Sequence, residues 1–423
     1  MTYLLPLGLL TLFTALKFHV GVVQLRPFDA VVVLMIGWVL VNGASFGQKR
    51  MVGFLMLLPF FLWHVLSALL GGADNGLREG LQVSLMIAFA TTIVLSLDLI
   101  DYKTAARVMI AGLVVVLAYN VIWHVSQGMW VGWKRLNNPK AVFDFLPMAL
   151  GCLVLFAAPA QRRLYWLVWI GLLVLIVLST ERKALIIYGV ITAILLARGR
   201  MLAALPLVGV GIIGLFIVIN LFAAESFTRH LRALTDPIES AGSAAMVARG
   251  VTPESLSNAQ RKFAFNVATT YFSQSPLIGI GTNEYANRVR EQYGYLPAYM
   301  LLGIHGEFLR VATENGLVGL IFYVAIWLSS VVRLRRVLFF FLRRRQITRP
   351  QAAVTPFLLL TAPLMYLGFE ASGTPSFTVL IIVSLMPELT YSALRQRATA
   401  MEAARERRRR SDVNFGSDQL VAG

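Results

Sequence analysis

The stretch MVGFLMLLPFFLWHVLSALL, residues 51–70, decides the fold class of this chain. It carries no Asp, Glu, Lys or Arg, and about 20 apolar residues is the length that crosses the hydrocarbon core of a bilayer as a helix. Inside a bilayer every backbone polar group must be bonded within the protein, so a continuous apolar run predicts a helix. Over all 423 residues, 57% are hydrophobic and 14% are charged. Soluble domains carry about 25% charged residues, so we predict a membrane protein.

Similar apolar runs recur along the chain and predict an all-α, polytopic fold with about twelve transmembrane helices. The weakest of them are the first, which is interrupted near Lys17 and His19, and the pair on either side of residues 179–183. Besides 51–70, the runs fall at about residues 3–20, 28–45, 81–98, 105–125, 142–158, 164–179, 184–198, 202–224, 313–333, 352–370 and 375–394.

The runs divide the chain into four predicted segments. Residues 1–224 hold about nine transmembrane helices, and residues 225–312 form one large extracytoplasmic, periplasmic loop. Residues 313–394 hold about three more helices, and residues 395–423 form a basic cytoplasmic tail. The tail is rich in Arg and Glu, so we expect a frayed helix or a disordered segment there.

Clusters of Lys and Arg predict the orientation of the helices, because such residues gather in cytoplasmic loops. An even number of predicted helices separates each pair of neighbouring clusters, so all of them fit the cytoplasmic side. Both termini then lie on the cytoplasmic side of a bacterial inner membrane. The clusters lie at residues 48–50, 162–163, 198–200, 333–349 and 405–410.

The formal net charge of +17 is explained by the same rule. In a soluble protein such a charge would indicate a nucleic-acid partner. Here the basic residues flank apolar runs, so we expect membrane lipids as partners and no nucleic acid.

His305 is the first candidate catalytic residue. It lies in the stretch GIHGEFLR, residues 303–310, just before the apolar run at 313–333. On the predicted topology it lies at the outer membrane surface, where a histidine exchanges a proton near neutral pH because its unperturbed pKa is about 6.5. That property suits a general base for a sugar hydroxyl. The alternative interpretation is an interfacial histidine that only anchors a helix end.

Arg182 and Lys183 are candidates for binding an anion. They lie in a very short external turn, residues 179–183, between two apolar runs. Positive charge on the outer side runs against the usual bias of membrane proteins. Because a guanidinium group binds diphosphate through paired hydrogen bonds, we expect these residues to hold a lipid pyrophosphate. The alternative is that their side chains only reach the lipid headgroups.

The predicted loop carries a second pair of basic candidates. Residues 258–273 are predicted to form an amphipathic helix, and the following SPLIGIG, residues 275–281, is predicted to form a turn. Arg261 and Lys262 lie near the start of that helix. They are either a second phosphate clamp or part of a solvated helix face.

Three further charged residues are candidates for supporting roles. Glu307 and Glu314 could orient His305 or the basic groups. Glu314 also lies four residues after Arg310, a spacing that predicts an ordinary helical ion pair. Arg135, in the external loop at 126–141, either lines an entrance for the donor or touches headgroups.

Some motifs are absent from the sequence. The sequence contains no Walker loop, so it does not indicate an ATP-driven pump. No cluster of His and Cys has zinc spacing, and no external Asp-x-Asp pair indicates a metal-held nucleotide sugar. We therefore expect no cofactor, no metal site and a donor that is already activated.

These residues occur in stretches that resemble the O-antigen ligase and polysaccharide polymerase superfamily, the Wzy_C-type membrane glycosyltransferases. The resemblance covers about residues 130–335 well and the rest of the chain by topology only. Three motifs in the family's order carry it: STERKAL at 179–185; Arg261 and Phe265 followed by SPLIGIG at 275–281; and His305 and Leu309 followed by ENGLVGL at 314–320.

The resemblance implies a helical fold similar to that of the GT-C glycosyltransferases. It implies a donor glycan linked to undecaprenyl pyrophosphate and transfer without a metal at the outer face of the membrane. On the matching positions, Arg182 and Arg261 would hold the pyrophosphate, and His305 would activate the acceptor hydroxyl.

Two functions within the superfamily fit the sequence. A polymerase transfers the growing glycan to another lipid-linked repeat unit and makes exopolysaccharide or O-antigen, whereas a ligase transfers it to lipid A-core. We favour the polymerase, because exopolysaccharide members often share this compact length. A chain-length regulator and a flippase of the same pathway are expected partners by analogy. A third interpretation, a flippase or transporter of lipid-linked glycans, would predict a repeat in two halves, which the sequence does not show clearly.

Overall fold

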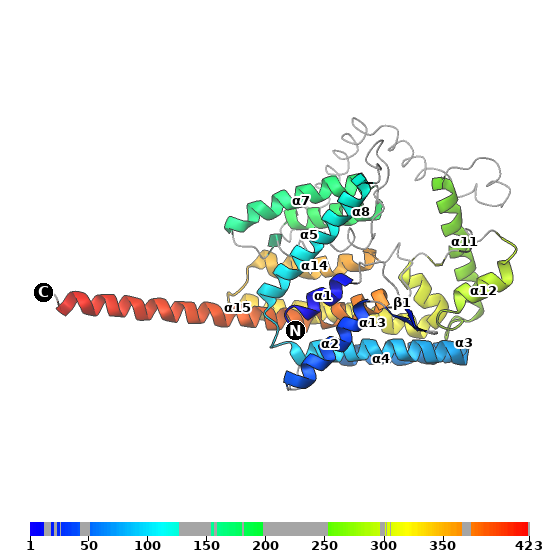
Figure 1. Ribbon diagram of the computed structural model, residues 1–423, viewed down its shortest axis with the longest axis horizontal. Helices are drawn as coiled ribbons and strands as arrows, with labels where there is room; N and C mark the ends of the chain where they lie inside the picture. The colour runs from blue at the N-terminus through cyan, green and yellow to red at the C-terminus, as the bar shows by residue number, and fades with distance from the viewer. Residues whose placement is uncertain are drawn as a thin grey trace, which may run out of the picture.

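The computed structural model describes most of the helical part of the chain (Figure 1). It describes residues 1–11, 18–20, 23–25, 27–42, 51–126, 154–155, 159–179, 182–197, 253–296, 301, 303–304, 306–365 and 374–421. The helices are α1 (Leu4–Thr11), α2 (Pro27–Asn42), α3 (Val52–Gly71), α4 (Ala73–Ser96), α5 (Tyr102–Ser126), α7 (Pro159–Ser179), α8 (Arg182–Ala197), α11 (Pro253–Gln274), α12 (Glu284–Tyr293), α13 (Glu307–Arg343), α14 (Arg349–Met365) and α15 (Thr374–Val421).

Four stretches of helix in the described part are long and apolar enough to cross a membrane. They correspond to the predicted runs at 51–70, 81–98, 313–333 and 375–394, so the chain is a helical membrane protein. Helix α2 and residues 187–196 of α8 are apolar but shorter. The predicted runs at 142–158 and 202–224 lie almost entirely outside the described residues. The four stretches are Val52–Gly71, Gly76–Ser96, Glu307–Arg343 and Phe377–Ala404.

The first predicted run does not form a single helix. Helix α1 ends at Thr11, and the strands β1 (Phe18–Val20) and β2 (Val23–Leu25) form an antiparallel pair with Phe18 opposite Leu25. The prediction of helix through residue 20 was therefore wrong for Phe18–Val20. Valine and phenylalanine favour strands, and the polar Lys17 and His19 interrupt the apolar helical pattern.

The basic tail is helical. Helix α15 continues from its apolar part to Val421 without a break and projects away from the body of the molecule (Figure 1). Of the two predicted possibilities, the structure shows the helix. Ala, Arg, Glu and Gln dominate residues 393–410, and all of them are strong helix formers.

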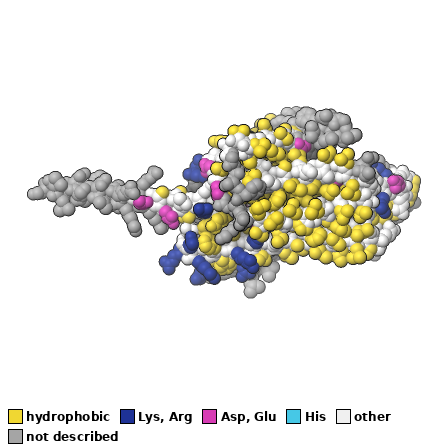
Figure 2. All heavy atoms as spheres, turned by 90° about the horizontal axis from the view of Figure 1, so that it is seen from below, with side chains coloured by type: hydrophobic (Ala, Val, Ile, Leu, Met, Phe, Trp, Pro, Cys, Tyr) yellow, Lys and Arg dark blue, Asp and Glu magenta, His cyan; other side chains and the backbone are white. Residues whose placement is uncertain are grey.

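A bundle of α3, α4, α13 and α15 forms the centre of the body (Figure 1). Its interior is aromatic: the rings of Phe61 and Phe377 meet edge to face at 5.5 Å, and those of Phe60 and Tyr323 lie 5.4 Å apart. All four side chains are almost fully buried. Apolar side chains cover much of the outer surface of the body as well (Figure 2), as expected for helices that face lipid.

A polar cluster joins three helices of the bundle near one end. The guanidinium group of Arg333 in α13 forms an ion pair with Glu388 of α15 and donates to the carbonyl of Ser384 at 2.7 Å. The backbone of Gly53 in α3 donates to the same Glu388 carboxylate at 3.1 Å and accepts from the Ser384 hydroxyl at 2.6 Å. Each of these charged or polar groups therefore has a partner from another helix, which apolar surroundings require.

Helix α13 is interrupted at Gly316, which has φ 67° and ψ −170°. The interruption leaves helical carbonyl and amide groups without partners inside the helix, and the segment 276–281 bonds with them. Four backbone hydrogen bonds join the two segments: Ile280 N to Thr313 O at 3.0 Å, Gly281 N to Glu314 O at 3.0 Å, Leu317 N to Pro276 O at 2.8 Å, and Val318 N to Leu277 O at 3.2 Å. The sequence predicted a turn at 275–281 but not this pairing.

Two glycines allow the segments to approach so closely. Gly279 has φ 77°, and a Cβ atom there would overlap the backbone of Glu314. A Cβ atom at Gly316 would overlap the carbonyl of Leu277. Because both obstacles are backbone atoms, no side-chain rotation would relieve the overlap. The pairing of 276–281 with the interruption of α13 therefore depends on glycine at both positions.

We predict that Gly316→Ala and Gly279→Ala each lower the thermal unfolding temperature of the purified protein. Alanine at Gly316 would adopt a backbone region that costs about 1–3 kcal/mol, before the overlap is added. Gly37→Ala is the control, because that helical glycine has nothing within 4 Å of the added methyl group. The close contact would be refuted if all three variants unfolded at the temperature of the wild type.

Candidate functional site

Helices α11 and α12 form a small unit with its own core at one end of α13 (Figure 1). Helix α11 contains the predicted amphipathic helix at 258–273. The hydroxyl of Tyr285 donates to the carbonyl of Ala264 at 3.2 Å, and that of Tyr271 donates to Gln292 at 2.8 Å. The core of this unit consists of Val267, Ala268, Tyr271, Ile280, Tyr285, Val289 and Ile304.

Two contacts fix this unit to the start of α13. The hydroxyl of Thr313 donates to the carbonyl of Ala268 in α11 at 3.2 Å. Ile304 is buried in the core of the α11–α12 unit, and Leu309 of α13 packs against that core. Position 305 follows Ile304 directly, so the backbone that leads into the predicted catalytic position is held against α11.

Tyr271 and Tyr285 of this unit are hydrogen-bond donors within its core. Burial raises the pKa of Tyr285 and also that of Tyr271 above the ordinary value of a phenol. Both hydroxyls therefore stay protonated at neutral pH. Neither hydroxyl is suited to accept a proton as a general base.

A buried ion triad lies in the first turns of α13. The guanidinium group of Arg310 donates to both carboxylate oxygens of Glu307, at 2.6 and 2.9 Å, and to Glu314 at 2.7 Å. All three residues are at most 6% exposed. The helical ion pair predicted from the spacing of Arg310 and Glu314 is present, and Glu307 completes it. A role of either carboxylate in orienting His305 stays a prediction.

A second buried polar cluster lies beside the triad. His64 of α3 and Glu79 of α4 form a pair with 3.1 Å between Nε2 and Oε2, and the amide of Asn283 donates to the other Glu79 oxygen at 2.5 Å. The Thr282 hydroxyl donates to the carbonyl of His64 at 3.0 Å and accepts from the amide of Asn315 at 2.6 Å. The cluster thus connects two membrane helices to the segment before α12 and to α13.

Further hydrogen bonds bind α3 to the interruption of α13. The hydroxyl of Ser67 donates to the carbonyl of Glu314 at 3.0 Å, and the indole of Trp63 donates to the carbonyl of Asn315 at 2.8 Å. These are carbonyls next to Gly316, where the helical hydrogen bonds stop. Non-helical backbone in a membrane protein needs such partners, because lipid supplies none.

Sequence reasoning missed this second cluster. His64 is a single charged or titratable residue in the apolar run at 51–70, and Glu79 lies between that run and the predicted run at 81–98. The one available signal was that a polar side chain inside a membrane helix needs a partner. The sequence does not say which distant residue supplies that partner.

The structure describes some of the predicted site residues and not others. His305 and Arg135 lie outside the described residues. Helix α8 begins at Arg182 and continues with Lys183, but the described part of the structure does not include their side chains. Arg261 is exposed on α11, three residues before the buried Ala264.

The turn that carries Arg182 joins two helices that pack on each other. Helix α7 ends at Ser179, and α8 begins at Arg182, as the two predicted runs required. The rings of Trp169 and Tyr188 stack with centroids 4.6 Å apart, and the Tyr188 hydroxyl donates to the Trp169 carbonyl at 3.0 Å. These contacts hold the short hairpin at 159–197 together.

A comparison with known protein families finds a match to part of the chain. Residues 166–324 match the family model described as O-antigen ligase. This segment belongs to the O-antigen ligase and polysaccharide polymerase superfamily. The match runs from α7 into α13 and includes the turn at 179–183, the glycine pairing and position 305. No curated protein matches the chain.

The superfamily match agrees with the geometry in one respect. Two of its motifs, SPLIGIG at 275–281 and ENGLVGL at 314–320, bond to each other through the backbone at Gly279 and Gly316. The glycines in these motifs are therefore explained by packing. Among the described residues, no group of three His, Cys, Asp or Glu side chains could hold a metal ion.

We predict that Arg310→Gln strongly lowers the stability of the protein, because it leaves Glu307 and Glu314 as buried carboxylates without their cation. Breaking a buried ion pair by removing one partner costs about 3–5 kcal/mol. The exposed Arg290 of α12 supplies the control, and Arg290→Gln should change the free energy of unfolding by less than about 0.5 kcal/mol. Equal thermal unfolding of the two variants would contradict a structural role for the triad.

Proposed function

We propose that the protein polymerises oligosaccharide repeat units linked to undecaprenyl pyrophosphate into exopolysaccharide or O-antigen. The reaction takes place at the periplasmic face of the inner membrane, with both termini of the chain in the cytoplasm. The observation that carries the proposal is the match of residues 166–324 to the O-antigen ligase family, which indicates transfer of a lipid-linked glycan.

The proposed reaction transfers a glycan from one lipid carrier to a hydroxyl group. The acceptor oxygen attacks the anomeric carbon of the donor sugar, and the bond from that carbon to the pyrophosphate oxygen breaks. The proton of the acceptor hydroxyl passes to His305, and undecaprenyl pyrophosphate leaves. Because the donor already carries a pyrophosphate leaving group, the proposed reaction needs neither ATP nor a metal ion.

The basic residues would stabilise the leaving group. Arg182 and Arg261, with Lys183, would neutralise the negative charge that the pyrophosphate gains as the bond breaks. Positively charged donors already held in place are most effective where water is partly excluded. The exposure of Arg261 is consistent with this role, because its side chain is available to a ligand.

The residue that precedes His305 packs with α11, the helix that carries Arg261. Ile304 and Phe263 both contact the core of the α11–α12 unit. Ile304 directly precedes His305 in the chain, and Phe263 follows Arg261 by two positions. The glycine pairing fixes the same unit on α13 from its other side. The residue before His305 and the helix that carries Arg261 therefore pack together.

A ligase is the second candidate, because the matching family is described as O-antigen ligase. In that case the acceptor is lipid A-core, and the roles of Arg182, Arg261 and His305 are unchanged. A chain-length regulator and a flippase of the same pathway are proposed partners of the polymerase.

We predict that His305→Ala abolishes glycan transfer while the protein reaches normal levels in the membrane. The test is glycan analysis of a deletion strain that carries either the wild type or the variant. General acid–base catalysis contributes about 10²–10⁴-fold, so loss of the base should be visible as loss of product. Full complementation by His305→Ala would show that the residue only anchors a helix end.

The products of the same deletion strain separate the two candidate functions. Accumulation of single lipid-linked repeat units identifies a polymerase. Long polymer that forms on the lipid carrier but does not reach lipid A-core identifies a ligase, and it would overturn the polymerase proposal.

We predict that Arg182→Lys and Arg261→Lys each reduce transfer at least about tenfold, although the charge is kept. Lysine is a point charge and cannot reproduce the paired hydrogen bonds of a guanidinium group with pyrophosphate. Arg290→Lys, an exposed change on α12, is the matched control and should leave transfer unchanged. Normal transfer by the variants at 182 and 261 would indicate that these side chains only contact lipid headgroups.

A further inference from the structure

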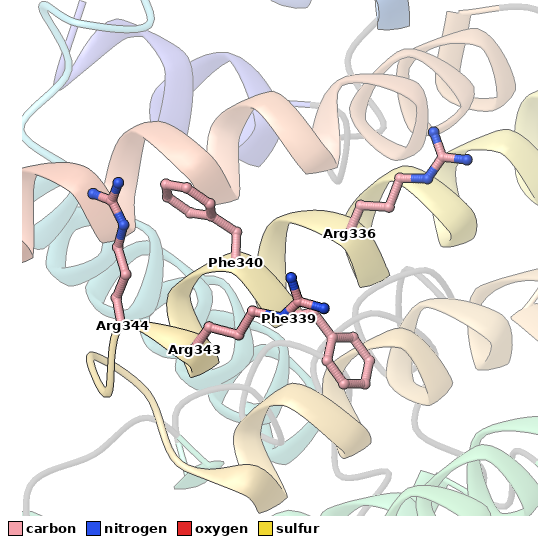
Figure 3. A pocket seen from close by; sticks show the side chains of 5 residues that line it. All are labelled: Arg336, Phe339, Phe340, Arg343 and Arg344. Carbon is pink, nitrogen blue, oxygen red and sulfur yellow. The ribbon is translucent and has the colours of Figure 1, made fainter.

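The end of α13 opposite the proposed active site has an open pocket with a volume of about 410 Å³. Its lining is basic and aromatic without a single acidic residue, which is unusual for a surface that contacts only water. Figure 3 shows the side chains, with Arg344 beside Phe340 and Arg343 beside Phe339. The lining residues are Arg336, Phe339, Phe340, Arg343 and Arg344.

The pocket continues an exposed apolar strip of the same helix. Leu328 and Val332 are 58% and 50% exposed, and Arg336 and Phe340 follow at the same spacing of four residues. Residues four apart lie on one face of a helix. One face of α13 therefore changes from aliphatic side chains to a group of basic and aromatic side chains. A phospholipid likewise changes along its length from apolar acyl chains to a charged phosphate group.

The arginines of the pocket differ from their neighbour Arg333. Arg333 is held by Glu388, whereas no carboxylate in the described part of the chain forms an ion pair with Arg336, Arg343 or Arg344. The guanidinium group of Arg344 lies over the ring of Phe340, 4.3 Å from its centre. This contact orients the cation and leaves its N–H groups available for an anion.

The surrounding surface agrees with this arrangement. In Figure 2, Lys and Arg side chains gather at the end of the apolar surface nearest the tail of α15. By the rule that placed the basic clusters, this is the cytoplasmic end. That rule requires only a general excess of positive charge, not a pocket with a defined lining.

We propose that this pocket binds the phosphate group of an anionic phospholipid, with the acyl chains along Leu328 and Val332. Arg336, Arg343 and Arg344 supply the cations, and Phe339 and Phe340 contact the glycerol region. Guanidinium groups match phosphate oxygens through charge-assisted hydrogen bonds, and basic pockets at the cytoplasmic ends of membrane helices bind anionic headgroups. The apolar strip distinguishes a lipid phosphate from free phosphate, which would not use it.

The test is lipid binding to the purified full-length protein, measured by native mass spectrometry. The probes are phosphatidylglycerol as the anionic lipid and phosphatidylcholine as the neutral one, and inorganic phosphate is added in excess as a competitor. The pocket variant is Arg343→Gln with Arg344→Gln. The control is Arg345→Gln with Arg349→Gln, since these residues are exposed at the same end but do not line the pocket. Both variants lose the same charge, and thermal unfolding checks that both are folded.

We expect the pocket variant to bind phosphatidylglycerol at least about tenfold more weakly than the wild type, as loss of charge-assisted contacts requires. The control variant should bind within about twofold of the wild type. Equal losses in the two variants would overturn the proposal, because binding would then follow overall charge. Equal binding of phosphatidylcholine, or displacement of the lipid by inorganic phosphate, would overturn it as well.

Discussion

The contact between Gly279 and Gly316 is the constraint on which the first half of α13 and the α11–α12 unit depend. A membrane helix that stops being helical must find other partners for its backbone, because lipid offers none. Here the segment 276–281 supplies four of those hydrogen bonds, and the side chains of Ser67 and Trp63 supply two more. The same contact fixes the α11–α12 unit on α13. The interruption of α13 and the position of the unit that carries Arg261 thus depend on the same contact. A larger residue in place of either glycine would disturb both.

Buried charge at this end has a consistent structural explanation. The triad of Arg310 with Glu307 and Glu314 lies one turn before the interruption, and the pair of His64 and Glu79 lies beside it. Removing charged groups from water is unfavourable unless every one of them is paired, so each cluster specifies one arrangement of the helices around it. The two clusters connect α3, α4 and α13 with the segment before α12. Together they hold these elements against one another at the first turns of α13.

Helix α13 has different chemistry at its two ends. Its first turns hold buried acidic and basic residues next to the proposed glycan site, while its last turns expose arginines and phenylalanines around an open pocket. Arginine in the first case is neutralised by two carboxylates, and in the second it has a ring beneath it. The same residue type therefore serves as an internal structural cation at one end of the helix and lines an open pocket at the other. Burial and the neighbouring side chains decide between these roles.

The sequence by itself determined the membrane class, the four long apolar helices, the helix at 258–273 and the ion pair of Arg310 with Glu314. These features depend on composition and on spacings of a few residues, which a sequence displays directly. The motifs around 179–185, 275–281 and 314–320 also indicated the superfamily, which the family match over residues 166–324 supports. Only the tertiary structure decided that two of these motifs bond to each other, that His64 pairs with Glu79 and that residues 18–20 form a strand rather than helix. The physical reason is that long-range partners are selected by packing and by the need to satisfy buried polar groups, and neither leaves a local pattern in the chain.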